Sequence, residues 1–488
     1  MPGLISDLIF LVGDFIVVVI VRYGELAIKR GSTRREMEEL LIRAIREATS
    51  ECGTSTMRRE PGRIFIYSEN DECVAARAAR VFGVVSASPA HETTFDSLEE
   101  LARWAAGLWA KEVAGRKFAV RAHRVGVHNF TSRDVAARVG ALLAEAGGKV
   151  DLERPDVELY IEVRANRAYA FDKEYRGPGG LPLGSEGKVL ALVSGGIDSP
   201  VAAWYIMRRG AYADILHCNL GGSLALSATL KVIERLLEWS YGYNARVYVA
   251  DCAKIADSIR RNIDSHLWSI AFKRALYRLA EVIARRAKAQ AIVTGESLGQ
   301  VSSQTLQALS AVEKDIDMPV LRPLIGLDKE EIVEAAKRIG TYELSTQVPE
   351  YCAIFSREPR RWASTAEIEA IDLALWDIIQ ATATEAKVYK KTELREVATS
   401  LSSEAHSVVI DQPPPGAVIV DLRDEESYAK WHLPGAVRVD VDKVFDFVEK
   451  MGRDNVYVFY CYTGGLSADV AERLRKSGYK AYSLLRKS

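Results

Sequence analysis

The chain has 488 residues and a formal net charge of −1, with 65 Lys and Arg against 66 Asp and Glu. This length predicts several domains, and the balanced charge excludes a uniformly basic protein, so any contact with nucleic acid must use local patches. The 6 cysteines are far apart and form no C-x-x-C pair, which argues against a zinc site. We therefore expect reduced cysteines, no structural metal and a cytoplasmic location.

The apolar start of the chain resembles a membrane anchor only at first sight. Leu4–Val21 contains Asp7, Gly13 and Asp14, and its uninterrupted part is Phe15–Val21. A membrane span needs roughly 20 apolar residues, so this segment predicts a buried strand instead.

The next part of the chain alternates between helical and strand patterns. Strands are expected over 15–21, 63–68 and 84–89, with helices from Thr33, which has capping-box spacing to Glu36, and over 73–81. This order predicts a small ferredoxin-like α+β fold. A second α/β unit is expected from a helix over 97–113, a strand over 117–125, a helix over 132–146 and strands over 157–164 and 168–175.

Basic and hydrogen-bonding side chains crowd into one region of this second unit, namely Lys117, Arg121, Arg124, His128 and Arg133. Side chains of these types contact phosphates in protein–nucleic acid complexes. An ordinary charged face would have the same composition, and both interpretations stay open. The segment Arg22–Lys29 is likewise compatible with an RNA contact or with a solvated loop.

A Gly/Pro linker at Gly177–Gly184 precedes the most informative stretch of the chain. Val189–Val193 is an apolar run typical of a central parallel strand, and Ser199–Arg209 has helical spacing. The turn between them contains two glycines, which let a backbone approach a ligand closely. Free N–H groups and the hydroxyls of Ser194 and Ser199 would form a cradle for anionic oxygens. A plain strand-turn-helix corner is the alternative.

Further apolar runs at 213–218, 246–250 and 291–294 alternate with helical stretches, which predicts a parallel sheet covered on both faces. Ligands of such sheets bind at the carboxyl ends of the strands. Thr294–Gln304 leaves one of these strands with two glycines and many hydroxyl and amide groups. Its composition suits a ribose, base or phosphate contact.

The C-terminal part follows a helix over 364–380, a weakly patterned stretch over 381–407 and the stiff segment Gln412–Gly416. Strands are expected over 418–422 and 456–460, and a helix over 467–477. Cys461 stands between the second strand and that helix, where loop amides and a helix N-terminus stabilise an anionic sulfur. A cysteine phosphatase would need an arginine six positions later, where this chain has Ser467.

Several of these motifs resemble known families. Ser194-Gly195-Gly196-Ile197-Asp198-Ser199 resembles the PP-loop, SGGxDS, of ATP pyrophosphatases, and KFAVRAHRVGVHNFTSRDVAARVG resembles a THUMP RNA-binding domain. Asp421-Leu422-Arg423, His432–Ala436 and the Cys461 loop resemble a rhodanese domain, although Thr463 stands where many rhodanese loops have arginine. The order of these parts is similar to that of the tRNA 4-thiouridine synthase family.

The resemblance implies a multidomain protein of α/β and α+β class. Its parts are expected to be a ferredoxin-like N-terminal domain over 1–76, a THUMP α/β domain over 77–176, a parallel-sheet PP-loop ATP pyrophosphatase domain over 177–380, a linker over 381–408 and a small α/β rhodanese domain over 409–488.

The resemblance also implies functional residues. The expected contacts of ATP are Leu192, Val193, Ser194, Gly195, Gly196, Ser199, Lys273, Gly295 and Gln304. Asp198 would hold Mg²⁺ or shape the phosphates, and Lys329, in LRPLIGLDKEE, would assist activation of the base. Cys352, in VPEYCAI, would have a redox role.

By the same resemblance the chain is expected to be a tRNA uracil 4-sulfurtransferase. A uridine O4 would attack the α phosphate of ATP, and a persulfide on Cys461, supplied by a cysteine desulfurase, would displace AMP. Cys352 would then form a disulfide with Cys461, which a thiol reductant reopens. A homodimer is compatible with this scheme. Two alternatives stay open: a rhodanese-type sulfur carrier for thiazole formation in thiamine synthesis, and a tRNA-binding protein with an inactive nucleotide site.

Overall fold

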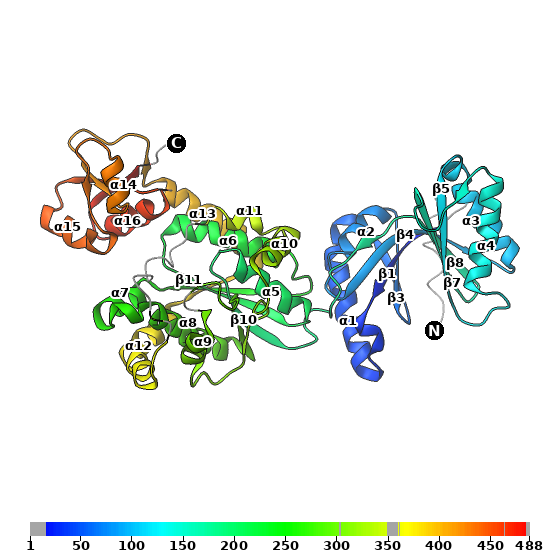
Figure 1. Cartoon of the computed structure of the whole chain (residues 1–488), viewed down its shortest axis with the longest axis horizontal. Coiled ribbons are helices and arrows are strands. Elements are labelled where there is room, and N and C mark those ends of the chain that lie inside the picture. Colours follow the sequence, from blue (N-terminus) through cyan, green and yellow to red (C-terminus); the bar gives the residue numbers. More distant parts are fainter. Residues whose placement is uncertain (1–15, 302–303, 349–359, 361, 463, 485–488) are drawn as a thin grey trace. The chain divides into compact units, whose positions relative to one another are not determined.

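The computed structural model of the chain (Figure 1) describes residues 16–301, 304–348, 360, 362–462 and 464–484. The chain divides into two compact units, Met1–Ser185 and Glu186–Ser488. Among the helices of the described residues, none combines the length and the apolar character that crossing a bilayer requires. Of the apolar start of the chain, residues 4–15 lie outside the described part, and Ile16–Tyr23 forms a strand.

The first unit contains one nine-stranded sheet with the strand order β2-β3-β1-β4-β8-β7-β5-β6, and β9 pairs with β4. The strands are β1 Ile16–Tyr23, β2 Ser55–Glu60, β3 Arg63–Ser68, β4 Val84–Thr94, β5 Lys117–Val125, β6 Lys149–Val150, β7 Val157–Arg164, β8 Arg167–Phe171 and β9 Tyr175–Arg176. The helices are α1 Gly31–Ala48, α2 Asp71–Ala78, α3 Leu98–Val113 and α4 Ser132–Glu145.

Strand β4 joins the two halves of this unit. It pairs antiparallel with β1 over almost its whole length and with β8 through its last residues. Helices α3 and α4 lie side by side against the second half (Figure 1), where Leu101, Trp109, Val139 and Leu159 belong to one buried cluster. The two predicted α/β parts therefore share one sheet, and the boundary that we expected after residue 76 falls inside α2.

Helix α1 begins earlier than the capping-box spacing of Thr33 and Glu36 predicts. Its first residue is Gly31, and its N-cap, Arg30, makes no side-chain capping bond. The capping prediction is therefore wrong. Met37, Leu41 and Ile45 are buried on one face of the helix, and this packing stabilises the helix more than a single cap does.

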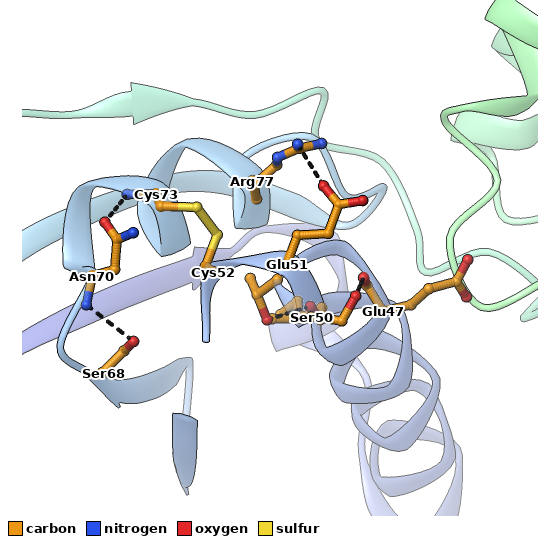
Figure 2. The surroundings of a disulfide bond; sticks show 10 residues. Glu47, Ser50, Glu51, Cys52, Ser68, Asn70, Cys73 and Arg77 are labelled. Atoms are coloured by element: carbon orange, nitrogen blue, oxygen red, sulfur yellow. Dashed lines mark hydrogen bonds and ion pairs between the residues drawn. A yellow bond between two sulfur atoms is a disulfide. The ribbon is translucent and has the colours of Figure 1, made fainter. Parts of the chain in front are cut away.

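Four of the cysteines that we expected to be reduced form two disulfides. Cys52, just after α1, is bonded to Cys73 in the first turn of α2 (Figure 2), beside an ion pair of 2.9 Å between Arg77 and Glu51. In the second unit Cys218 is bonded to Cys252. The expectation failed because sequence spacing hides spatial neighbours: the Cα atoms are 5.7 Å and 5.6 Å apart in the two pairs.

The second unit begins with a six-stranded sheet of order β14-β13-β10-β11-β12-β15. Its strands are β10 Lys188–Leu192, β11 Tyr212–Asn219, β12 Arg246–Asp251, β13 Ala291–Val293, β14 Val320–Leu321 and β15 Lys387–Lys390. The helices are α5 Asp198–Arg208, α6 Ser223–Leu237, α7 Ala253–Asn262, α8 Trp268–Ala287, α9 Leu306–Glu313, α10 Lys329–Ile339, α11 Tyr342–Ser345 and α12 Thr365–Glu385.

This sheet is parallel except for β15, which pairs antiparallel with β12. Leu190 and Leu216 belong to a buried cluster that includes residues of α7, α8 and α12. Ala191 and Ile215, on the opposite face, are also buried. Both faces of the central strands are thus covered, as the apolar runs predict.

The end of the chain forms a five-stranded parallel sheet of order β16-β20-β19-β17-β18. The elements are α13 Leu394–His406, β16 Val409–Ile410, β17 Val418–Asp421, α14 Glu425–Lys430, β18 Val437–Arg438, α15 Val444–Met451, β19 Val456–Tyr460, α16 Gly465–Lys476 and β20 Lys480–Leu484. Residues 381–408, which we expected to be a linker, contain the end of α12, β15 and α13, and α13 packs against α6.

Candidate active site

The glycine turn lies between the end of β10 and the start of α5, at the carboxyl edge of the parallel sheet. The Ser194 N–H donates a hydrogen bond of 3.0 Å to Ser199 Oγ, and the two Oγ atoms are 3.2 Å apart. Gly195 has a φ of +87°, and a Cβ on it would lie 2.6 Å from Thr229 Oγ1. Only glycine fits this position, and the turn leaves its hydroxyls and amides at the sheet edge.

Asp198 connects three segments that are far apart in the sequence. Its Oδ1 lies 2.7 Å from Lys329 Nζ, and its Oδ2 accepts a hydrogen bond of 3.1 Å from Gln300 Nε2. Lys329 is held at the start of α10, where Asp328 and Glu331 form a capping box. The structure therefore brings together Asp198 and Lys329, and it adds Gln300, which sequence reasoning did not single out.

The segment after β13 lies directly against the start of α5. A Cβ on Gly295 would be 2.7 Å from Ser199 Cα and 2.8 Å from Ser199 N. Two chain segments that were expected to contact ATP are therefore in van der Waals contact. Ser345 Oγ also donates a hydrogen bond of 3.5 Å to the Gly196 carbonyl, which ties α11 to the turn.

Lys273, on α8, is part of a buried charged network centred on Glu296. The Glu296 carboxylate lies 2.8 Å from Lys273 Nζ and 2.8 Å from Arg322 Nε, and it accepts a hydrogen bond of 2.6 Å from the Tyr277 hydroxyl. Burial alone would raise the pKa of Glu296, but its partners outweigh burial and lower it. Glu296, Arg322 and Tyr277 were missed from the sequence, although Glu296 stands inside the Thr294–Gln304 segment.

Two more of the expected ATP contacts differ in their free hydrogen-bonding capacity. The backbone of Val193 is already occupied, since its N–H donates to Leu216 O and its carbonyl accepts from His217 Nδ1 at 2.9 Å. Burial lowers the pKa of His217. The side-chain Oε1 of Gln304, in contrast, is buried without a hydrogen-bond partner among the described residues. Leu192 is half-buried at the end of β10.

The five expected RNA-binding residues differ in the partners that their side chains already have. On β5, Lys117 pairs with Asp151 and Arg121 pairs with Glu158, each at 2.9 Å. Arg124 Nη1 lies 3.0 Å from His128 Nδ1, whose ring bonds the Ala165 carbonyl through Nε2 at 2.7 Å. Arg133 is exposed in the first turn of α4.

Cys461 follows β19 and precedes α16. It is half-buried, it is the free cysteine of the described residues, and its Sγ lies 3.4 Å from Ser467 Oγ. Nearby, Arg423 pairs with Asp421 at 2.7 Å, and its guanidinium lies 5.4 Å from the ring centroid of Tyr460. Cys352 and Thr463 lie outside the described residues.

The site fits a nucleoside triphosphate. The cradle that a Cβ would fill and the ammonium next to a carboxylate lie at the carboxyl edge of the sheet, and the segment after β13 adds the buried Gln304 Oε1, which is free to accept a hydrogen bond from an amino group. The described residues contain no group of three or more His, Cys, Asp or Glu able to hold a metal. A PP-loop nucleotide domain followed by a cysteine-loop domain defines the class of protein.

Comparison with known families identifies each part of the chain. The family model of thiamine biosynthesis protein (ThiI) matches residues 184–375, the ThiI ferredoxin-like domain 18–88, the THUMP domain 92–171, and the rhodanese-like domain 405–488. These matches confirm the predicted fold class.

Relatives cover nearly the whole chain. It is 62% identical to a tRNA sulfurtransferase of Pyrobaculum aerophilum over 96% of both chains, and 36% identical to one of Thermoplasma volcanium over 95% of this chain and 94% of that one. A crystal structure of a 4-thiouridine synthetase–RNA complex with bound ATP matches with a TM-score of 0.68 and 30% identity, covering 77% of this chain and 99% of the other. The chain belongs to the ThiI family of tRNA sulfurtransferases.

Proposed function

We propose that this chain uses ATP to activate a uridine of tRNA and replaces its O4 by sulfur from a persulfide, which gives 4-thiouridine. The observation that carries the proposal is the contact of Asp198 with Lys329 beside the glycine turn, in a unit that also contains the free Cys461. One chain thus combines a site for activating an oxygen with a carrier for sulfur.

In the activation step the uridine O4 attacks the α phosphorus of ATP, and pyrophosphate leaves. Ser194, Ser199 and the amides of the turn hold the phosphates. The Lys329 ammonium neutralises the negative charge that develops on the departing pyrophosphate, which is a preorganised electrostatic role. Asp198 would hold Mg²⁺, which when bound would supply further positive charge next to the same oxygens. The product is a uridine whose O4 carries AMP and has become a good leaving group.

In the sulfur step the terminal sulfur of the Cys461 persulfide attacks C4, and AMP leaves with O4. The uridine C4 is now joined to Cys461 through an S–S bond. The Cys352 thiolate attacks the Cys461 sulfur of this bond, which releases the thiocarbonyl on the uridine and leaves a Cys352–Cys461 disulfide. Two thiol groups are oxidised and the transferred sulfur is reduced, so a thiol reductant must reopen the disulfide. The Ser467 hydroxyl, 3.4 Å from Cys461 Sγ, can turn its proton toward the anionic sulfur.

The partners follow from this chemistry. A cysteine desulfurase supplies the persulfide in the cytoplasm, and the first unit binds tRNA. Arg124, His128 and Arg133 are better placed for phosphates than Lys117 and Arg121, because acidic neighbours neutralise the latter two. A homodimer would let the RNA-binding unit of one subunit serve the active site of the other.

A reconstitution tests the proposal. Purified protein, ATP-Mg²⁺, unmodified tRNA, a cysteine desulfurase and cysteine are expected to yield 4-thiouridine in the digested RNA. Cys461→Ser should abolish the thionucleoside while pyrophosphate release with tRNA continues. Full thiolation by this variant would refute the sulfur path, and the absence of pyrophosphate release with the wild-type protein would refute the activation step. Thiazole labelling in the same mixture would reveal a sulfur-carrier role in thiamine synthesis, which the family name suggests.

A further inference from the structure

The N-terminus of α6 is unusual because its cap comes from the C-terminal domain. Its own N-cap residue, Gly222, has no side chain with which to bond the free N–H groups of the first turn. Glu472, on α16, occupies this place. Its Oε2 accepts from the Ser223 N–H and its Oε1 accepts from the Ser223 hydroxyl, both at 2.8 Å. Two segments 249 positions apart thus form a bidentate helix cap.

The groups around this cap are buried and closely packed. Ser223, Asp469 and Glu472 are each 6% exposed. Arg473 donates a hydrogen bond of 2.7 Å to the Leu220 carbonyl and pairs with Asp469 at 2.9 Å. Lys476, also on α16, pairs with Glu472 at 2.7 Å. Each of the two buried carboxylates therefore has a positive partner, which offsets part of the cost of burying it.

Shape and apolar packing strengthen the same contact. A Cβ on Gly222 would lie 2.7 Å from Glu472 Oε2 and 3.1 Å from Asp469 Cα, so the two backbones approach closely only because this residue is glycine. Leu224, in the first turn of α6, packs against the apolar core of the C-terminal domain. Ser227 Oγ also donates a hydrogen bond of 2.7 Å to the Ala398 carbonyl of α13.

The position of the contact relates it to the nucleotide site. Residues 220–223 follow the carboxyl end of β11, the strand that pairs in parallel with β10, and the glycine turn follows the carboxyl end of β10. Helix α16, which carries Glu472, begins four residues after Cys461. The C-terminal domain is therefore attached at the sheet edge where ATP is expected, through the helix that follows the sulfur-carrying loop.

We propose that the start of α6 is a docking site that holds the sulfur-carrying C-terminal domain on the nucleotide domain during sulfur transfer, with Glu472 as the cap that closes it. The docking site itself stands on the contacts above, and its role in sulfur transfer rests on the proposed function. Gly222 and Glu472 are docking residues and not catalytic ones.

Two variants of the full chain test this proposal from opposite sides of the contact. Gly222 has a φ of −77°, which alanine adopts freely, so Gly222→Ala disturbs the approach of α16 and not the backbone of α6. Glu472→Gln keeps the shape of the side chain but leaves only one of the two acceptor oxygens that bond Ser223, and it removes the charge that pairs with Lys476. The matched control is Gly326→Ala, because a Cβ on Gly326 meets nothing within 4 Å.

The first measurement is amide hydrogen exchange followed by mass spectrometry. Both docking variants are expected to raise exchange at least tenfold in the first turn of α6 and along α16, while the control matches the wild type. This arm needs no RNA and no turnover, so it decides on docking even if the wild-type protein forms no thionucleoside. Unchanged exchange in both variants would overturn the docking site.

The second measurement is single-turnover thiolation from protein whose Cys461 has been loaded with persulfide beforehand. Both docking variants are expected to transfer sulfur at least tenfold more slowly, with persulfide loading and pyrophosphate release unchanged. Faster exchange together with wild-type transfer would overturn the role of the contact in sulfur delivery. A slower transfer with equally slow pyrophosphate release would also overturn it, because the defect would then lie in the nucleotide site.

Discussion

The buried network around Glu296 gives a stability prediction that can be worked out from its contacts. Glu296 is 6% exposed and bonds Lys273, Tyr277 and Arg322. Removing one member of a buried ion pair costs about 3–5 kcal/mol, because the remaining charges stay buried without compensation. Glu296→Gln keeps one acceptor oxygen, and Arg322 keeps its ion pair of 2.7 Å with Glu313. We therefore expect a loss near the lower end, about 3 kcal/mol.

The assay is urea unfolding followed with and without ATP, with Glu385→Gln as the control. Glu385 forms an ion pair of 3.1 Å with Lys254, but both side chains are more than half exposed, so its loss should cost less than about 1 kcal/mol. The lowered pKa of Glu296 adds a pH signature. The ionised Glu296 side chain contributes to the free energy of unfolding above the ordinary carboxyl pKa, and this contribution disappears as the pH falls through the lowered pKa. The difference in free energy of unfolding between the variant and the wild type should therefore vanish in acid. Equal losses for the two variants would refute the reasoning.

Three further predictions concern other parts of the chain. Lys329→Ala should slow pyrophosphate release by about 10²-fold while ATP binding persists. If the affinity for ATP fell by as much as the rate of pyrophosphate release, the electrostatic role in the transition state would be contradicted. Replacing Cys52 and Cys73 by serine should lower the free energy of unfolding of the first unit by about 3 kcal/mol, since the bond closes a loop of 21 residues; unchanged denaturant midpoints would disprove it. Burial raises the pKa of Asp469 to about 6; Glu472 and Asp251 act in the same direction, and Arg473 opposes them. The contribution of Asp469 to the free energy of unfolding is therefore greatest in acid and is lost as the pH rises from about 4 to 6. Asp469→Asn should remove about 3 kcal/mol of this pH dependence.

The sequence predicts local structure best where one face of an element is apolar. The strand over 117–125 was predicted with the bounds that β5 has, and it contains a buried apolar run, Phe118–Val120. Strand β2, with the sequence STMRRE, was missed, because its polar residues become a strand only by pairing with β3. Residues 387–390 are similar: they form β15 by pairing with β12, a contact that no local pattern indicates.

The residues of the candidate site also differ in how well the sequence predicts them. The glycine turn could be predicted because its chemistry lies in consecutive residues. Roles for Asp198 and Lys329 were expected only through a family resemblance, and their pairing was not predicted, since the two residues are 131 positions apart. Glu296 and Arg322 show no signal of their own, because a buried ion pair has the same residue types as an exposed one. The cap of α6 by Glu472 could not be predicted at all, because it joins two segments 249 positions apart that belong to different sheets of the second unit.

The topology of the second sheet explains why these distant residues converge. Strands β13, β10 and β11 are adjacent and parallel, so the segments that follow them leave at one edge. These segments carry Gly295, Asp198 and Gly222, and a Cβ on Gly295 or Gly222 would collide with the element packed against it. The glycines therefore allow two close approaches at the same edge, one by the start of α5 and one by the C-terminal domain. Because activation of an oxygen and delivery of sulfur must occur at one nucleobase, an edge that attaches both the nucleotide and the sulfur carrier meets the geometric requirement of the reaction.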